Sequence, residues 1–229
     1  MRERELEVRK LGRVAYFDAL SLQKELEEQV ITERERDYLL LLEHPHTFTL
    51  GRRAQDSGVL ATAEVLKRLG AEVFASNRGG KVTYHGLGQL VGYPIISLSP
   101  NREDVHKYVR DLEEVLIRTM RNFEIDAFQI DGLTGVHTAE GKVAAIGVHL
   151  KRWVTTHGLA LNVNTDLSYY NWIIACEGEP VTSMVQILGR EVDMADVETR
   201  LAVNFREVFG YGTSERSASY ERAVLARHL

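Results

Sequence analysis

The chain has 229 residues, of which 44% are hydrophobic and 27% are charged, and it contains one cysteine. These fractions are typical of a globular protein, whereas a lone cysteine excludes an intramolecular disulfide and a zinc site built from several thiolates. The net charge of −5 argues against a nucleic-acid-binding protein, because such proteins usually carry a basic excess. Segment 1–13 lacks the apolar core of a signal peptide, and no apolar run approaches the roughly 20 residues of a membrane span. We therefore expect a cytoplasmic protein without nucleic-acid or membrane partners.

Helical spacing of apolar residues predicts helices at about 18–36, at about 62–69, after Asn101 and at about 193–208. Asn101 is the expected N-cap of the third helix, with Glu103 and Asp104 in its first turn, where carboxylates are favourable. Gly70 and Gly210 should end the second and fourth helices, because glycine readily adopts the left-handed conformation of a helix C-terminus.

Strands are predicted between the helices, over 38–42, 72–75 and 90–93. Asp131-Gly132 should turn a hairpin between 128–130 and 133–136, and Lys151-Arg152 should turn a second hairpin within 143–163. Antiparallel hairpins mixed with separate helices favour an α+β fold, a mixed sheet backed by helices, over repeated βαβ units. The sequence contains no linker-like or repetitive tract, so we predict one domain over 1–229, with a core at about 38–208 and a peripheral tail at 211–229.

The segment from Arg78 to Tyr93 is rich in glycine, a residue that lets the backbone turn sharply or approach a ligand closely. Hydrogen-bonding side chains alternate with the glycines, and these are Arg78, Lys81, Thr83, Tyr84, His85 and Gln89. The mixture suits a site that holds a polar group beside an apolar ligand, although a glycine-rich hairpin with scattered polar residues explains it equally well. The segment has neither the order of a P-loop nor that of a dinucleotide-binding fingerprint.

The same segment resembles the signature of the lipoyl(octanoyl) transferase family, in the pattern Arg78-Gly79-Gly80-x-x-Thr83-Tyr84-His85-x-x-Gly88-Gln89-x-x-x-Tyr93. Further blocks follow in the family's order, and they are Gly141–Gly147, His157–Val163, Ala175-Cys176 and Val181–Met184. Leu87 stands where the family usually has proline, and Ala175 and Glu177 replace the usual proline and glycine beside the cysteine. A carboxylate at Glu177 would oppose thiolate formation if it pointed at the thiol.

The resemblance implies the fold of biotin and lipoate protein ligases, and transfer of an octanoyl group from octanoyl-acyl carrier protein to a lysine of a lipoyl domain. The acceptors would be lipoyl domains of 2-oxoacid dehydrogenase complexes and the glycine cleavage H protein, and neither a cofactor nor a metal would be needed. The catalytic residues would be Cys176 and Lys142. The substrate-binding residues would lie in three segments, and they are Arg78, Gly79, Gly80, Lys81, Val82, Thr83, Tyr84, His85, Ala145, Ile146, Gly147, Gly158, Leu159 and Ala160.

Cys176 is the nucleophile in this interpretation, whereas a lone cysteine considered without the family is more often a buried structural residue. A free thiol has a pKa of about 8.5, so a nearby cation is needed to increase its thiolate fraction near neutral pH. Lys142 is the candidate because it stands at the start of an apolar strand, although a solvent-facing lysine is the commoner situation. His85 could orient the acyl carbonyl or shuttle a proton, or it could simply satisfy the loop backbone.

An octanoyl chain needs an apolar slot, in which Gly79, Gly80, Gly147 and Gly158 would leave space for methylene groups. Positive charge at the mouth would attract acidic protein partners, and the candidates are Arg78, Lys81, Lys151 and Arg152. Two alternatives stay open. The first is an ATP-dependent lipoate or octanoate protein ligase of the same fold, whose acyl-adenylate chemistry needs no cysteine. The second is an inactive module that binds acyl groups or lipoyl domains.

Overall fold

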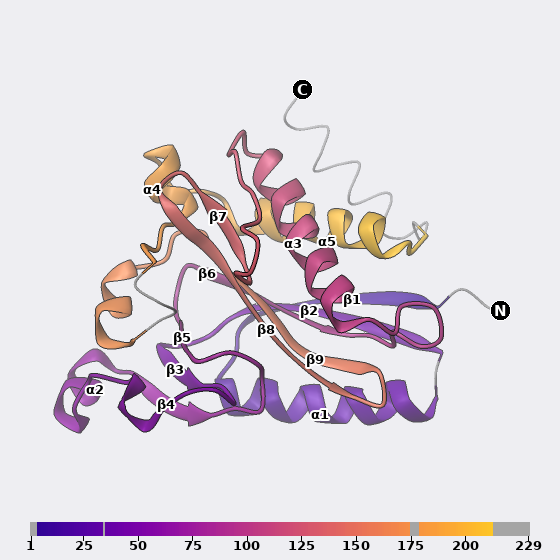
Figure 1. The fold of residues 1–229 in the computed structure, drawn as a ribbon, viewed down its shortest axis with the longest axis horizontal. Helices are drawn as coiled ribbons and strands as arrows, with labels where there is room; N and C mark the ends of the chain where they lie inside the picture. The colour runs from indigo at the N-terminus through magenta and orange to yellow at the C-terminus, as the bar shows by residue number, and fades with distance from the viewer. Residues whose placement is uncertain (1–3, 34, 175–178, 213–229) are drawn as a thin grey trace.

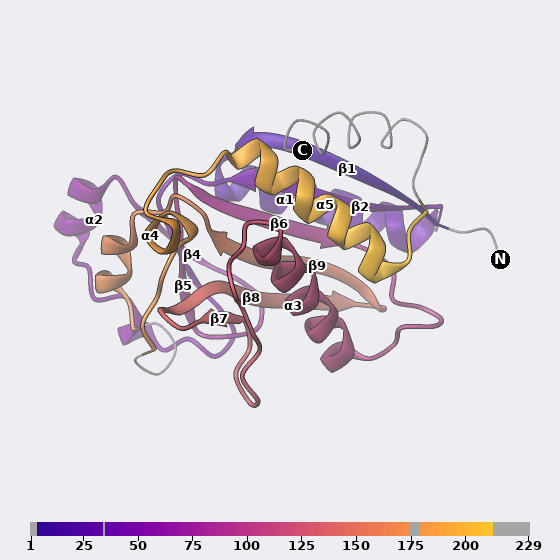
Figure 2. The same ribbon diagram turned by 90° about the horizontal axis from the view of Figure 1, so that it is seen from above.

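The computed structural model describes residues 4–33, 35–174 and 179–212. A six-stranded mixed sheet lies at the centre, between helix α1 (Tyr16–Thr32) on one face and helices α3 (Val105–Arg121) and α5 (Met194–Phe209) on the other (Figures 1 and 2). A three-stranded sheet stands at one end of the large sheet, beside helix α2 (Ala63–Leu69). The predicted α+β class is confirmed.

The strands of the large sheet are ordered β1-β2-β6-β9-β8-β7, and those of the small sheet are ordered β4-β3-β5. The bounds in the large sheet are β1 Glu5–Arg13, β2 Arg36–Glu43, β6 Gln89–Ile95, β7 Val136–Thr138, β8 Gly141–Lys151 and β9 Val154–Asn162. Those in the small sheet are β3 Thr47–Leu50, β4 Glu72–Ala75 and β5 Val82–His85. The shorter helical elements are η1 Asp56–Gly58, η2 Leu167–Trp172 and α4 Met184–Leu188.

Two helices end at the predicted glycine stops, whereas the first helix, α1, ends at Thr32 and not near Arg36, where β2 begins. Gly70 and Gly210 both cap their helices in the left-handed conformation, as the sequence predicts. The N-cap of α3 is Asp104 and not Asn101, because the Asp104 carboxylate accepts a hydrogen bond from the Lys107 N–H at 3.0 Å. Asp104 therefore satisfies one of the backbone donors left open at the start of the helix.

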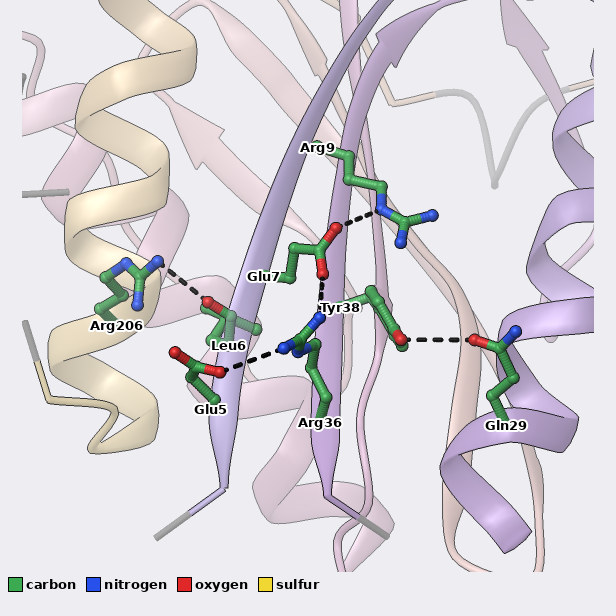
Figure 3. A network of polar contacts seen from close by, with 8 residues as sticks. All are labelled: Glu5, Leu6, Glu7, Arg9, Gln29, Arg36, Tyr38 and Arg206. Atoms are coloured by element: carbon green, nitrogen blue, oxygen red, sulfur yellow. Dashed lines mark hydrogen bonds and ion pairs between the residues drawn. The ribbon is translucent and has the colours of Figure 1, made fainter. Parts of the chain in front are cut away.

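Strand β1 is not predicted from the sequence, because charged residues obscure its apolar pattern. It forms the edge of the large sheet, paired in parallel with β2. Figure 3 shows Arg36 of β2 between Glu5 and Glu7 of β1, at 3.4 and 2.8 Å. The carbonyl oxygen of Leu6, whose side chain is buried in the core, accepts a hydrogen bond from Arg206 of α5 at 3.0 Å. Charged side chains and a helix thus cover an edge that would otherwise expose unpaired backbone groups.

The second predicted hairpin is formed by β8 and β9, whose antiparallel register pairs Lys151 with Val154. The turn is Arg152-Trp153, one residue later than predicted, and both residues have positive φ, at 50° and 63°. Such angles characterise a tight two-residue hairpin turn. The first predicted hairpin is only a bridge between Phe128 and His137, and strand β7 begins at Val136 and not at Leu133.

The large sheet has a hydrophobic core on each face. Helices α3 and α5 cover a core that includes Leu159 and Leu161 of β9, while α1 covers Tyr93 of β6 and Ala160 of β9. Among residues 4–33, 35–174 and 179–212, no helix is both long and apolar enough to cross a membrane.

Candidate functional site: a slot between the sheets and an adjoining lysine cavity

A slot lies on the α1 side of the large sheet, over a floor of small residues from β8 and β9. The register pairs Ala145 with Ala160 and Gly147 with Gly158. Side chains alternate between the faces of a strand, so these four residues share one face, whereas Ile146 and Leu159 pack toward the core under α3 and α5. The residues that line the slot are Tyr16, Arg78, Thr83, His85, Tyr93, Ala145, Ile146, Gly147, His157, Gly158, Leu159 and Ala160.

The glycines of the slot allow close backbone packing more than they provide empty volume, which corrects the sequence-based expectation. A Cβ atom at Gly147 would lie 3.0 Å from the carbonyl oxygen of Gly79. A Cβ atom at Gly158 would lie 2.3 Å from the carbonyl oxygen of Gly92, on the neighbouring strand. The N–H of Gly79 donates to the carbonyl of Val148 at 2.9 Å, so the glycine-rich loop closes directly onto β8.

Arg78 is a buried wall of the slot and not a surface charge at its mouth. Its Nη2 donates to the carbonyl oxygen of Thr49 at 2.6 Å, and its Nε donates to the Thr49 hydroxyl at 3.1 Å. Thr49 lies in β3, so the guanidinium joins the small sheet to the slot. Its positive charge also helps to lower the pKa values of His85 and His157, for which burial is the larger cause.

The histidines of the slot are neutral near pH 7. Burial lowers the pKa of His157 to about 3, and it lowers the pKa of His85 well below its ordinary value. The Nε2 of Gln89 donates to the carbonyl of Tyr84 at 3.1 Å, and a carbonyl can only accept, so Oε1 is the acceptor that faces Nδ1 of His85 at 2.8 Å. His85 therefore carries its proton on Nδ1 and its lone pair on Nε2.

Lys142 is the second residue of β8, and it is mostly buried at the end of the strand opposite to the hairpin turn. Its Nζ donates to the carbonyl oxygen of Thr134 at 2.6 Å and lies 3.8 Å from Oε2 of Glu179. The same carboxylate oxygen lies 3.5 Å from Nε2 of His137, the residue paired with Lys142 on β7. The cation is thus held between a carbonyl and a carboxylate.

The Lys142 side chain faces a second cavity, which adjoins the slot. The residues that line this cavity are Val82, Thr83, Lys142, Ala144, Ala145, Asn162, Tyr170, Glu179 and Val181. Thr83 and Ala145 line both cavities, so the two spaces meet there. The structure thereby brings the three predicted segments together with Lys142 around one continuous region.

Several predicted residues lie elsewhere. The side chain of Tyr84 points away from the slot, where its hydroxyl meets Nδ1 of His46 at 2.7 Å and its ring stacks on Tyr169. Gly79, Gly80 and Lys81 do not line either of these two cavities. Lys151 lies beside the hairpin turn, ion-paired with Glu28 of α1, and it is nine residue steps along β8, about 30 Å, from Lys142. Neither Lys151 nor Arg152 lines either cavity, and their expected place at the mouth of the slot stays a prediction.

Cys176, the predicted nucleophile, and Glu177 beside it lie outside the described residues. The site also contains residues that were not among the predicted site residues, and these include Tyr16, Tyr93, His157 and Glu179. His157 and Tyr93 belong to the matched blocks, so the resemblance could have indicated them. Tyr16 comes from the start of α1, and no local pattern marks it.

Most of the chain matches a known protein family. Residues 15–206 match the family model described as lipoyl protein ligase A/B catalytic domain. The chain is 48% identical over 205 residues to a Solibacter usitatus protein named octanoyltransferase, covering 89% of this chain and 93% of that protein. It is 47% identical over 210 residues to a Rubrobacter xylanophilus protein of the same name, covering 90% and 94%.

Solved structures share the fold at much lower identity. A putative lipoate protein ligase of T. acidophilum with bound lipoic acid superposes with a TM-score of 0.69 at 17% identity, covering 98% of this chain and 95% of that chain. Biotin protein ligase from Aquifex aeolicus gives a TM-score of 0.52 at 13% identity, covering 90% and 69%. The expected likeness to the fold of biotin and lipoate protein ligases is confirmed. The chain belongs to the lipoyl protein ligase A/B catalytic-domain family, within the group of relatives named octanoyltransferase.

Proposed function

We propose that this chain transfers an octanoyl group from octanoyl-acyl carrier protein to a lysine of lipoyl domains, through a thioester on Cys176. The proposed acceptors are lipoyl domains of 2-oxoacid dehydrogenase complexes and the glycine cleavage H protein. The observation that carries the proposal is the junction of an apolar slot with the cavity of Lys142, in a chain whose relatives at 41–49% identity are named octanoyltransferase. We place the reaction in the cytoplasm, where a reducing environment would keep the single thiol free.

The slot has the chemistry that a hydrocarbon chain requires. Its floor is made of alanine and glycine, and its histidines are uncharged at neutral pH because burial lowers their pKa values. Each methylene group buried there contributes about 0.8 kcal/mol to binding. The neutral histidines add no further charge that the chain would have to desolvate, and the guanidinium of the Arg78 wall is already hydrogen-bonded to Thr49.

In the first half-reaction the thiolate of Cys176 attacks the thioester carbonyl of the carrier. A new C–S bond forms on Cys176, the carrier's C–S bond breaks, and the released thiolate takes a proton. The ammonium of Lys142 lowers the free energy of the attacking thiolate, because an adjacent cation favours the charged form of a thiol. Lys142 is held for this role by the carbonyl of Thr134 and the carboxylate of Glu179.

In the second half-reaction the acceptor lysine attacks the octanoyl-enzyme. Its ammonium loses two protons as the N–C bond forms and the C–S bond of Cys176 breaks. One proton passes to the sulfur, and the other passes to the side chain of Lys142 after that side chain has released its own proton to solvent. This is covalent catalysis in two steps, with an acyl-enzyme that can be isolated between them.

An ATP-dependent ligase is the alternative that the fold comparison keeps in view, since lipoate-protein ligase A bound with ATP superposes with a TM-score of 0.70 at 16% identity. The decisive experiment is intact-mass measurement after mixing with octanoyl-acyl carrier protein, with and without ATP. We expect one octanoyl adduct without ATP, released by hydroxylamine and absent from Cys176→Ala. A strict requirement for ATP would contradict transfer, and an adduct that persists in Cys176→Ala would contradict the assigned nucleophile.

A further inference from the structure

The cavity that contains Lys142 has a different character from the acyl slot. Its lining combines short apolar residues, Val82, Ala144, Ala145 and Val181, with a carboxylate from Glu179. The slot and this cavity meet at Thr83 and Ala145. A group that enters the second cavity therefore approaches the end of any chain that occupies the first.

Glu179 is the negatively charged group of this cavity's lining. Its side chain is 19% exposed, and its Oε2 lies 3.8 Å from Nζ of Lys142 and 3.5 Å from Nε2 of His137. Both contacts are longer than a good charge-assisted hydrogen bond, which measures about 2.8 Å. The carboxylate thus retains capacity to accept a short hydrogen bond from another cation.

We propose that the Lys142 cavity receives the side chain of the acceptor lysine, and that Glu179 binds its ammonium group. The inference rests on the proposed function, and it identifies the acceptor subsite. A lysine side chain consists of four methylene groups ending in a strongly hydrated ammonium, so its stem suits apolar walls and its end requires a counter-charge. The short aliphatic residues provide the apolar walls for the stem, and Glu179 provides the counter-charge for the ammonium.

The need for the carboxylate follows from the charges already present. The acceptor brings a second ammonium beside that of Lys142, and two cations in a partly buried space repel each other strongly. A carboxylate between them offsets this repulsion until the acceptor loses its protons. A neutral amide at the same position would leave the repulsion uncompensated.

The test separates the two half-reactions in the full-length enzyme and uses Glu179→Gln, which keeps the shape of the side chain and removes its charge. Acylation is measured by mixing enzyme with octanoyl-acyl carrier protein, and transfer is measured by mixing isolated octanoyl-enzyme with a lipoyl domain. We expect Glu179→Gln to raise the lipoyl-domain concentration for half-maximal transfer at least tenfold more than it slows acylation. Glu179→Asp, which restores the charge, should recover part of the loss.

Glu140→Gln is the matched control, because Glu140 is an exposed carboxylate on the turn between β7 and β8. It should leave both half-reactions within twofold of the wild type. Equal slowing of acylation and transfer in Glu179→Gln would show that Glu179 acts through Lys142, and unchanged transfer would show that it binds no acceptor; either result overturns the inference. Absence of any acyl-enzyme in the wild type would instead refute the proposed function, so the two failures are distinguishable.

Discussion

The Nδ2 of Asn162 donates to the carbonyl oxygen of Thr182 at 3.0 Å, and the N–H of Thr182 in turn donates to the carbonyl of Lys142 at 3.0 Å. The N–H of Lys142 donates to the carbonyl of Pro180 at 2.8 Å, so the backbone of the candidate catalytic lysine is bonded on both sides to segment 180–182. The other end of the Asn162 amide, its Oδ1 atom, accepts a hydrogen bond from Nε2 of Gln89 at 2.9 Å. One buried amide thus joins the Lys142 backbone to the residue that orients His85.

Asn162→Asp should therefore reduce both stability and activity. The substitution places a carboxylate oxygen against the carbonyl of Thr182, and an unsatisfied buried acceptor costs about 1–3 kcal/mol. Urea unfolding measures the loss of stability, and octanoyl-enzyme formation measures the loss of activity. Asn101→Asp, on the exposed surface, is the control and should change the free energy of unfolding by less than about 0.5 kcal/mol. Equal stability of the two variants would contradict this account of Asn162.

Lys142→Ala should slow formation of the octanoyl-enzyme by about 100-fold or more, the usual contribution of a positioned acid–base group. The rate should partly recover at higher pH, where Cys176 ionises without help. Single-turnover mass spectrometry provides the measurement. Lys151→Ala is the control, because Lys151 lies at the far end of β8 beside Glu28, and it should acylate at the wild-type rate. A Lys142→Ala variant with the wild-type rate and pH profile would exclude Lys142 as the partner of the thiol.

Stability should fall in mild acid because of the buried histidines. Burial lowers the pKa of His157 to about 3 and that of His44 to about 4, whereas histidines of the unfolded chain titrate near 6.5. Below about pH 6.5 the unfolded state binds more protons than the folded state, so the free energy of unfolding decreases as the pH falls toward 4. Each histidine should contribute about 2 kcal/mol of this decrease between pH 7 and pH 4.5.

A comparison of variants separates the contribution of the histidines from that of the buried carboxylate Asp37. Burial raises the pKa of Asp37, so its protonation in the folded state increases the free energy of unfolding as the pH falls. His157→Asn should show a smaller loss of stability between pH 7 and pH 4.5, and asparagine tolerates the φ of 57° at that position. His106→Asn, at an exposed site, should keep the wild-type dependence. An unchanged slope in His157→Asn would mean that His157 is not held neutral by the fold.

Gly158→Ala should destabilise the protein by about 2 kcal/mol or more, because the new Cβ atom would lie 2.3 Å from the carbonyl oxygen of Gly92 and separate β9 from β6. Gly79→Ala is the contrasting variant, since the nearest atom to its Cβ is the carbonyl oxygen of Val148 at an ordinary 3.5 Å. Urea unfolding should therefore distinguish the two substitutions clearly. Similar stabilities would indicate that β6 and β9 can separate without cost.

Much of the fold follows from local patterns. The alternating apolar residues of 143–163 predict the hairpin that carries the slot floor, and the stops at Gly70 and Gly210 follow from glycine's access to the left-handed region. Strand β1 cannot be predicted from its local pattern, because the ion pairs that its charged residues make with Arg36 form only when the sheet is assembled. The sequence also does not decide the N-cap of α3, because Asn101 and Asp104 are both good capping residues and only the folded structure shows which one caps the helix.

The residues of the candidate site likewise fall into those that the sequence predicts and those that it does not. The family resemblance locates the floor and Lys142, because these residues lie within contiguous blocks. It does not locate Tyr16, which comes from the start of α1, or Glu179, which lies between the matched blocks at 175–176 and 181–184. Lys151, which we expected at the mouth because of its charge, lies at the end of β8 opposite to Lys142. The direction in which a strand runs through the sheet determines which end of the site each of its residues reaches, and that direction is set by the tertiary fold.

The floor of the slot consists of two rungs of the β8–β9 ladder, and the rungs differ in how freely they can change. Neighbouring backbone blocks larger side chains at Gly147 and Gly158, from Gly79 on one side and Gly92 on the other. Ala145 and Ala160 already carry side chains. Proteins that evolve from this sequence should therefore change the size of the slot mainly through substitutions at Ala145 and Ala160, whereas Gly147 and Gly158 should stay glycine.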